Sequence, residues 1–236
     1  LIMIKICDLY VWYDKEFILE NVNLQLKSGE IYTLIGKNGS GKTTLINTIC
    51  GVLPTFKGSI VIGNSSFNAE SPSKIIQSSK EERYYIADNP EKIKYMNCLQ
   101  YINLILDVYN TKINKKLLQY YMERYQFTNH KNKMIDELSL GNLKKLNIIC
   151  SYLINTRVLI FDEPLNGLDI QSIEKFIEDI QLLKKKGYLV ILSTHILDVV
   201  ERFTNKIVLI NNKKATELTF ENASQIREVL DVDETT

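Results

Sequence analysis

The sequence predicts an α/β fold in which a mostly parallel sheet is flanked by helices, with an antiparallel β subdomain at the N-terminus and a helical insertion. Three observations lead to this prediction. Short apolar runs alternate with helical patterns late in the chain, and an early segment alternates apolar with polar residues. The stretch from about 90 to 140 has helical spacing and no convincing strand-like run.

The first strands are expected within residues 2–35. Residues 2–6 are mostly apolar, and Val22, Leu24 and Leu26 alternate with Asn and Gln as on a half-buried strand. A Ser-Gly-Glu turn at 28–30 separates them from a mostly apolar run at 31–35. Such a run is typical of a strand covered on both faces, as in parallel sheets.

Later strands and helices follow the same logic. Four more runs resemble buried strands: 84–86, 158–161, 189–192 and 207–210. Between the last three lie helical stretches. One has apolar residues at helical spacing from Ile173 to Leu183, with lysines in its last turn and Gly187 placed to end it.

The predicted insertion has apolar residues at helical spacing around 99–109 and 117–125. Because no linker or internal repeat divides the chain, we expect one domain over 1–236. Its catalytic core with the β subdomain is expected at about 1–89 and 141–236, and its helical subdomain at about 90–140.

Composition excludes several classes of protein. The chain has 236 residues, 29 Lys+Arg against 28 Asp+Glu, and 45% hydrophobic residues, which fits a soluble globular domain. A net charge of +1 gives no broad cationic face, so no nucleic-acid partner is expected. No apolar run reaches about 18 residues, so no membrane span is expected. Four widely spaced cysteines indicate reduced thiols.

The strongest chemical signal is Gly-Lys-Asn-Gly-Ser-Gly-Lys-Thr at 36–43, between an expected strand and an expected helix at 44–49. Its glycines let backbone N–H groups approach phosphate oxygens, and the helix N-terminus adds its dipole. Lys42 is expected to reach the β- and γ-phosphates of ATP, and Thr43 to hold Mg²⁺. The phosphate-binding set is expected to be Gly36, Asn38, Gly39, Ser40, Gly41, Lys42, Thr43 and Thr44. The core is therefore predicted to be a P-loop NTPase.

Two adjacent carboxylates follow the apolar run at 158–161. In a parallel sheet, ligands bind at this end of the strands. Asp162 is expected to complete the Mg²⁺ shell, and Glu163 to polarise a water that attacks the γ-phosphate. The alternative is a helix cap or a solvated turn, and it is disfavoured by the presence of the P-loop.

Further motifs occur in a fixed order: Leu-Ser-Leu-Gly-Asn at 138–142, Asp-Glu-Pro at 162–164, Asn-Gly-Leu-Asp at 166–169 and Ser-Thr-His at 193–195. With the P-loop, this order resembles the ATP-binding cassette (ABC) ATPases over nearly the whole chain. The resemblance matches the family signature at Leu138, Ser139 and Gly141, its D-loop at 167–169, and its switch histidine at His195.

The resemblance implies a mechanism in which two such domains pair head to tail around ATP. Ser139 and Gly141 would then bind the γ-phosphate of a nucleotide held by the opposite subunit. Glu163 would act as the general base, and His195 would contact the γ-phosphate. The partners implied are a second ABC ATPase subunit and an integral membrane permease.

The resemblance to the ABC ATPases also implies an aromatic that stacks on adenine, about where Tyr13 lies, 29 residues before Lys42. Trp12 is its rival, and an ordinary strand aromatic is the alternative for Tyr13. Stacking requires only an aromatic face, so either ring is chemically suited to the role.

Two positions depart from the family pattern. Leu140 and Asn142 replace the third and fifth signature residues, which resembles short bacterial exporter subunits; the alternative is a weakened site that needs a better partner subunit. No Gln follows the expected strand at 84–86, and Asp88 is the nearest equivalent. Asp88 is expected either to ligate Mg²⁺ or accept from the attacking water, or to be a turn residue before Asn89 and Pro90.

The leading functional hypothesis is the nucleotide-binding subunit of an ABC transporter that hydrolyses MgATP to power a separate permease. Export of a peptide, lantibiotic or drug is favoured by resemblance. The subunit would be cytoplasmic, peripheral on the inner face of the membrane, with residues 95–105 partly exposed for permease docking. The alternative is a soluble ABC ATPase that acts in assembly, similar to the iron–sulfur-assembly type.

Overall fold

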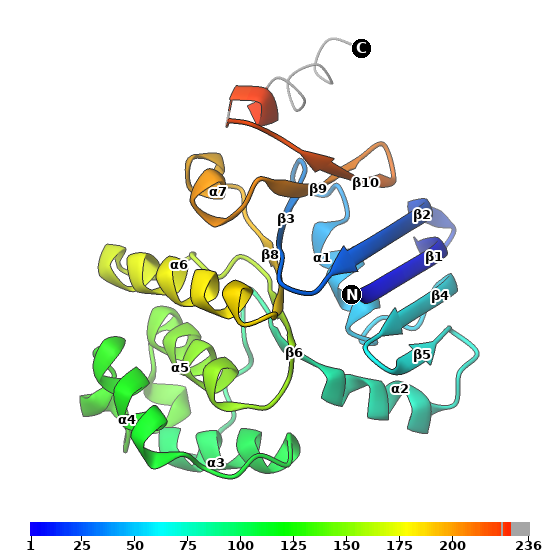
Figure 1. Ribbon diagram of the computed structural model, residues 1–236. Coiled ribbons are helices and arrows are strands. Elements are labelled where there is room, and N and C mark those ends of the chain that lie inside the picture. The colour runs from blue at the N-terminus through cyan, green and yellow to red at the C-terminus, as the bar shows by residue number, and fades with distance from the viewer. Residues whose placement is uncertain (223, 228–236) are drawn as a thin grey trace.

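The computed structural model describes residues 1–222 and 224–227, which form two sheets with helices around them (Figure 1). The antiparallel sheet is built from β1 (Ile2–Tyr13), β2 (Glu16–Lys27), β4 (Phe56–Ile62) and β5 (Ser65–Phe67), in the order β2-β1-β4-β5. β1 and β2 form a long hairpin in which Tyr13 faces Glu16 across the turn. α2 (Ser73–Ser79) then leads toward the second sheet.

The second sheet has the order β10-β9-β3-β8-β7-β6. Five of its strands are parallel, and β10 (Lys214–Thr219) adds an antiparallel edge to β9 (Lys206–Asn211). The other strands are β3 (Ile31–Ile35), β6 (Arg83–Ile86), β7 (Val158–Phe161) and β8 (Leu189–Ser193). The carboxyl ends of β3 and β7 therefore lie at one edge of this sheet, on either side of β8.

The central strands are buried on both faces, which explains their almost wholly apolar sequences. In β7, Val158 and Ile160 pack toward the antiparallel sheet and α1 (Lys42–Ile49), whereas Leu159 and Phe161 pack toward the helical side. The two hydrophobic clusters on these faces hold the antiparallel sheet to one side of the second sheet and the helices to the other.

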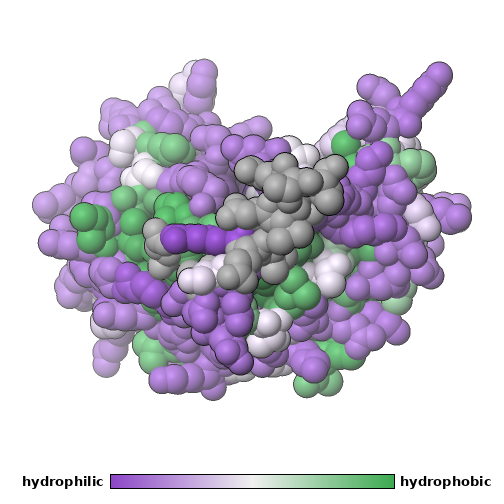
Figure 2. All heavy atoms as spheres, turned by 90° about the horizontal axis from the view of Figure 1, so that it is seen from above, coloured by the Kyte–Doolittle hydropathy of each residue, from purple (hydrophilic) through white to green (hydrophobic). Residues whose placement is uncertain are grey.

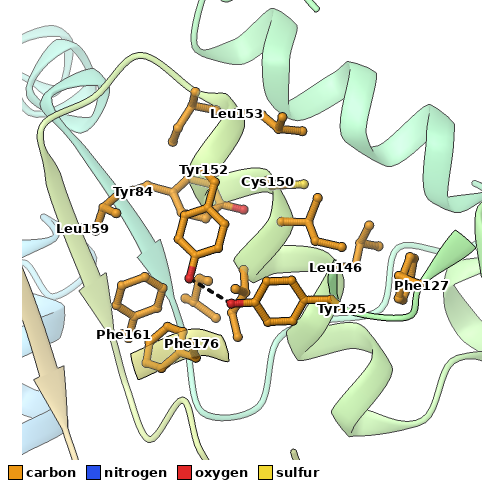
Figure 3. Close-up of a cluster of buried hydrophobic side chains, with 14 of the residues drawn as sticks. Tyr84, Tyr125, Phe127, Leu146, Cys150, Tyr152, Leu153, Leu159, Phe161 and Phe176 are labelled. Atoms are coloured by element: carbon orange, nitrogen blue, oxygen red, sulfur yellow. Dashed lines mark hydrogen bonds between the residues drawn. The ribbon is translucent and has the colours of Figure 1, made fainter. Parts of the chain in front are cut away.

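The helical side consists of α3 (Cys98–Val108), α4 (Lys115–Arg124), α5 (Leu140–Leu153) and α6 (Ile170–Lys185), and α7 (Leu197–Phe203) precedes β9. Figure 3 shows their shared core, in which Phe161 and Phe176 lie edge to face and the Tyr125 and Tyr152 hydroxyls are 3.1 Å apart. Edge-to-face aromatic pairs stabilise a core beyond their buried area. These contacts tie α6 to β7 and the end of α4 to α5.

The predicted α/β class is confirmed, including the antiparallel N-terminal sheet and the mostly parallel second sheet. The predicted strand at 2–6 is too short, because β1 continues to Tyr13 through irregularities in its pairing. Residues 90–140 contain α3, α4 and 3₁₀ turns, as expected for the insertion. No prediction was made for β4, β5, α2 or β10; β5 and α2 are short, and β10 lies at a sheet edge.

The state of the cysteines and the character of the surface agree with what the composition predicted. All four cysteines are free, and Cys50, Cys98 and Cys150 are buried; burial raises the pKa of Cys50 to about 12. Figure 2 shows a largely hydrophilic face with scattered apolar groups. In the part of the chain that the structure describes, no helix combines the length and the apolar character needed to span a bilayer.

Candidate active site

The loop between β3 and α1 turns tightly and passes close to the backbone of β9. Gly39 and Gly41 have positive φ angles of 80° and 107°, which glycine adopts without steric cost. A Cβ on Gly36 would lie 2.4 Å from the Ile210 carbonyl oxygen, so a side chain is excluded there. The loop thus ends with its backbone N–H groups at the N-terminus of α1, where anions are favoured.

Lys42 is the first residue of α1, and its side chain folds back toward the start of this loop. Its Nζ donates to the Gly36 carbonyl oxygen at 2.8 Å and to that of Lys37 at 3.2 Å. Burial lowers the pKa of the Lys42 ammonium, and the negative charges of Glu163 and Asp162 partly oppose this effect. The cation therefore faces two carboxylates across a confined space.

Asp162 follows β7 and is 3% exposed. Its Oδ2 accepts from the Thr43 hydroxyl at 2.8 Å, and its Oδ1 accepts from the Ser193 hydroxyl at 2.5 Å. The side chain is thus fixed between the start of α1 and the end of β8. A hydroxyl and a carboxylate in contact are hard oxygen donors of the kind that Mg²⁺ uses together with phosphates and waters, so these residues fit the ion.

Glu163 adopts a left-handed backbone conformation with φ of 46°, which costs a non-glycine residue about 1–2 kcal/mol. The Ser193 hydroxyl accepts from its N–H at 2.8 Å. Its Oε2 lies 3.0 Å from the Nδ1 of His195, a side chain that is 57% exposed. The turn thus directs the Glu163 carboxylate toward His195 at the sheet edge.

These residues enclose a cavity of about 260 Å³. Its lining comprises Asn38, Gly39, Gly41, Lys42, Thr43, Thr44, Asp162 and Glu163. Every one of them was predicted from the sequence, whereas Gly36 and Ser40 do not line the cavity. The Ser40 hydroxyl is buried without a hydrogen-bond partner in the described structure. Chemically, the cavity offers backbone N–H groups and one cation for phosphates, and oxygen donors for a divalent cation.

The family model described as ABC transporter matches residues 19–166. The chain belongs to the ABC transporter family. It is 35% identical over 213 residues to the putative ABC transporter ATP-binding protein AlbC of Bacillus subtilis, covering 90% of this chain and 89% of that protein. It is 30% identical over 212 residues to the lantibiotic transport ATP-binding protein SrtF of Streptococcus pyogenes, covering 90% and 88%.

Among solved structures, an ATP-binding subunit of an ABC transporter has a TM-score of 0.85 and 25% identity, covering 99% of this chain and all of that one. The family membership makes this chain an ATP-binding subunit and an ATPase of the ABC class. The roles of its individual site residues remain predictions.

The ABC signature residues lie at the N-terminus of α5, outside the cavity. The Ser139 hydroxyl accepts from the Asn142 N–H at 3.3 Å and so caps the helix. A Cβ on Gly141 would lie 2.1 Å from the Gly167 carbonyl oxygen, so the D-loop approaches here too closely for any side chain. Ser139 is exposed, and Leu140 is 39% exposed beside it.

The two candidate adenine-stacking residues end β1, and neither lines the cavity. Tyr13 is 45% exposed. Trp12 packs edge to face on Phe17 and lines a separate cavity with Tyr10 and Lys57. Because adjacent strand residues point to opposite faces, Tyr13 lies on the other face of β1 and does not line the cavity formed by Tyr10, Trp12 and Phe17.

Asp88 does not line the cavity either. Its Oδ1 accepts from Lys144 Nζ at 2.9 Å and from the Asn166 amide at 3.3 Å, and the Asn89 amide donates to its Oδ2 at 3.2 Å. Both oxygens of the Asp88 carboxylate thus have protein partners, and its metal role stays a prediction.

Two contributors to the site were not among the predicted residues. Ser193 bonds both Asp162 and the Glu163 backbone; its place at the end of a strand, just before His195, was the available signal. Lys144 bonds Asp88 and the Glu163 carbonyl oxygen, and no sequence pattern marked it.

Proposed function

We propose that this chain is the nucleotide-binding subunit of an ABC exporter, which hydrolyses MgATP as one of two paired subunits and powers a separate integral membrane permease. The observation that carries the proposal is the convergence of Lys42, Thr43, Asp162 and Glu163 on one cavity at the carboxyl edge of the parallel sheet, with His195 in contact with Glu163. Phosphoryl transfer depends mainly on such positioning and charge.

Each residue has a distinct proposed task. Lys42 and the loop N–H groups bind phosphate oxygens, and Glu163 accepts a proton from the attacking water. His195 shares its Nδ1 contact with Glu163 and is exposed enough to reach a nucleotide. Thr43 and Asp162 would hold Mg²⁺, which supplies charge neutralisation at the phosphates when bound.

A head-to-tail dimer is part of the proposal. Ser139 and Gly141 do not line the cavity; they lie at the helix N-terminus, where Ser139 is exposed and Gly141 is half-buried. Helix N-termini favour phosphate through their free N–H groups and dipole. A nucleotide contact by these residues accordingly calls for the cavity of a second copy or of a related subunit.

Tyr13→Ala is expected to weaken MgATP binding by about 1–3 kcal/mol, the usual contribution of base stacking on an aromatic ring. Trp12→Ala is the matched control, because Trp12 contacts Phe17 and belongs to the other cavity. Equilibrium titration with ATP measures both variants. If Trp12→Ala weakens binding and Tyr13→Ala does not, the adenine assignment passes to Trp12.

A groove between the end of α1 and α3 fits the proposed permease contact. It has a volume of about 300 Å³ and is lined by Cys50, Val52 and residues of β6, α3 and α5. Val52 and Val108 are 57% and 56% exposed at this groove. Exposed apolar residues beside a groove are typical of a surface that receives a partner helix. The expected docking range 95–105 contributes Tyr101 and Ile105.

Export is supported by the Ser-Leu-Gly signature at 139–141 and by the similarity to SrtF, whose name specifies lantibiotic transport. A peptide, lantibiotic or drug is the proposed cargo class. The subunit would then lie on the cytoplasmic face of the membrane, attached through the permease.

Val108→Asp is expected to abolish co-purification with a co-expressed integral membrane permease, because a charge would be buried in the groove. ATP binding by the isolated subunit should stay unchanged. Leu182→Asp, at a residue that is 50% exposed on α6, is the matched control and should keep the complex. An intact complex with Val108→Asp would exclude this groove, and a stable soluble partner found without membranes would favour an assembly role.

A further inference from the structure

A buried lysine links the signature helix to the predicted general base. Lys144, in the second turn of α5, is fully buried. Its Nζ lies 2.9 Å from Asp88 Oδ1 and donates to the Glu163 carbonyl oxygen at 2.7 Å. An ammonium group in a protein interior requires a counter-charge and hydrogen-bond acceptors, and these two oxygens supply them.

The contact joins three segments that are distant in sequence. Asp88 follows β6, Lys144 lies on α5, and Glu163 follows β7. The Asn166 amide donates to the same Asp88 oxygen, so the start of the D-loop is tied to the network as well. Asp88 is 37% exposed in its side chain, so its carboxylate reaches both solvent and the buried cation.

Glu163 depends on this network because its backbone is in the left-handed region. Such a conformation persists only where the surroundings fix it. On one side the Ser193 hydroxyl accepts from the Glu163 N–H, and on the other Lys144 donates to the Glu163 carbonyl oxygen. The direction of the Glu163 side chain toward His195 follows from both anchors.

We propose that Lys144 is a positioning residue that holds the Glu163 backbone in its left-handed conformation, with Asp88 as its counter-ion rather than a magnesium ligand. The inference rests on the proposed general-base role of Glu163. α5 also carries Ser139 and Gly141 at its N-terminus. Lys144 therefore connects the segment that would contact one nucleotide to the carboxylate that would act on the other.

Lys144→Met removes the donor and the charge while keeping a similar side-chain length. We expect kcat for MgATP hydrolysis to fall roughly ten- to hundredfold, as for loss of a hydrogen bond from a charged group. The Kd for ATP and the Mg²⁺ concentration that gives half-maximal rate should stay within about twofold, because the residues that bind the phosphates are unchanged. A kcat within twofold of wild type, in a folded variant, would overturn the proposal.

Asp88→Asn separates the two roles of Asp88. It keeps the Lys144 donor for Glu163, so we expect a smaller loss of kcat than in Lys144→Met and no change in the Mg²⁺ requirement. An increased Mg²⁺ requirement in Asp88→Asn alone would make Asp88 a metal ligand and overturn its role as counter-ion.

A double variant covers the case in which Lys144→Met fails to fold. Lys144→Gln with Asp88→Asn retains an amide donor near the Glu163 carbonyl and buries no charge. We expect the kcat of this double variant to be higher than that of Lys144→Met. Where Lys144→Met does not fold, the comparison is Lys144→Leu with Asp88→Asn, which has no donor and should have a lower kcat than the Lys144→Gln double variant. Equal rates with and without the donor would refute positioning by hydrogen bonding.

Arg124→Met is the control for lost stability, because it breaks another ion pair, to Asp179 at 2.9 Å, between α4 and α6. It should lower the melting temperature with kcat within twofold of wild type. A kcat loss equal to that of Lys144→Met would assign both effects to general destabilisation. Absence of hydrolysis in the wild-type dimer would instead remove the proposed function itself, so the two failures are distinguishable.

Discussion

Glu163→Gln is expected to lower the rate of ATP hydrolysis by about 10²–10⁴-fold while MgATP binding is kept, because an amide cannot accept the proton of the attacking water. Gln has nearly the shape of Glu and keeps an oxygen 3.0 Å from His195 Nδ1 in the same rotamer. The Ser193 and Lys144 contacts involve only the backbone of Glu163, so its left-handed turn should persist.

The same variant is expected to accumulate as a dimer in MgATP, since nucleotide that is bound between two subunits but not hydrolysed continues to link them. Size-exclusion chromatography with and without MgATP measures the dimer, and phosphate release measures turnover. Glu123→Gln, at an exposed position on α4, is the control. A Glu163→Gln variant that hydrolyses ATP at the wild-type rate and stays monomeric would contradict the general-base assignment.

The sequence was most informative where structure and chemistry are both local. The P-loop needs a strand, a turn of glycines and a helix within a few residues, and all eight residues that line the cavity could be named from two short segments. The apolar runs of β3, β7 and β8 were equally clear, because strands buried on both faces contain almost no polar residue.

Elements with weak patterns were missed for physical reasons. β5 has three residues and β10 is an edge strand with mostly polar, exposed side chains, so neither has a periodic apolar signal. β1 continues beyond residue 6 only through shifts in its register with β2 and β4, and these shifts interrupt the alternation of apolar and polar residues.

The Lys144 network shows a different limit of sequence reasoning. Asp88 was considered only for its position after β6, because its partner lies 56 residues away in the chain. Lys144 follows Leu143 on a helix whose residues are almost all buried from 143 to 153, so a lysine there has no exposed helix face to occupy. Long-range pairing of buried charges depends on tertiary geometry that local patterns do not encode.

Lys42→Ala is expected to weaken MgATP binding by at least about 10²-fold, because each charge-assisted hydrogen bond to a phosphate contributes about 1.5–3 kcal/mol. The loss should exceed that of Tyr13→Ala, since Lys42 is the cation that lines the cavity and its Nζ faces two carboxylates and the loop carbonyls. Removal of the ammonium leaves Asp162 and Glu163 to repel the phosphates.

Thermal unfolding with increasing MgATP is the decisive measurement for Lys42→Ala. A ligand that binds only the folded state raises the melting temperature with concentration, and this rise should be lost in the variant. Lys116→Ala, at an exposed position on α4, should keep it. The melting temperature without nucleotide should change little in Lys42→Ala, because the Gly36 and Lys37 carbonyls that bonded Lys42 lie beside an open cavity where water can replace it. A normal nucleotide-induced rise in Lys42→Ala would contradict the phosphate-binding role of the Lys42 side chain, because this variant keeps the backbone N–H groups of the loop.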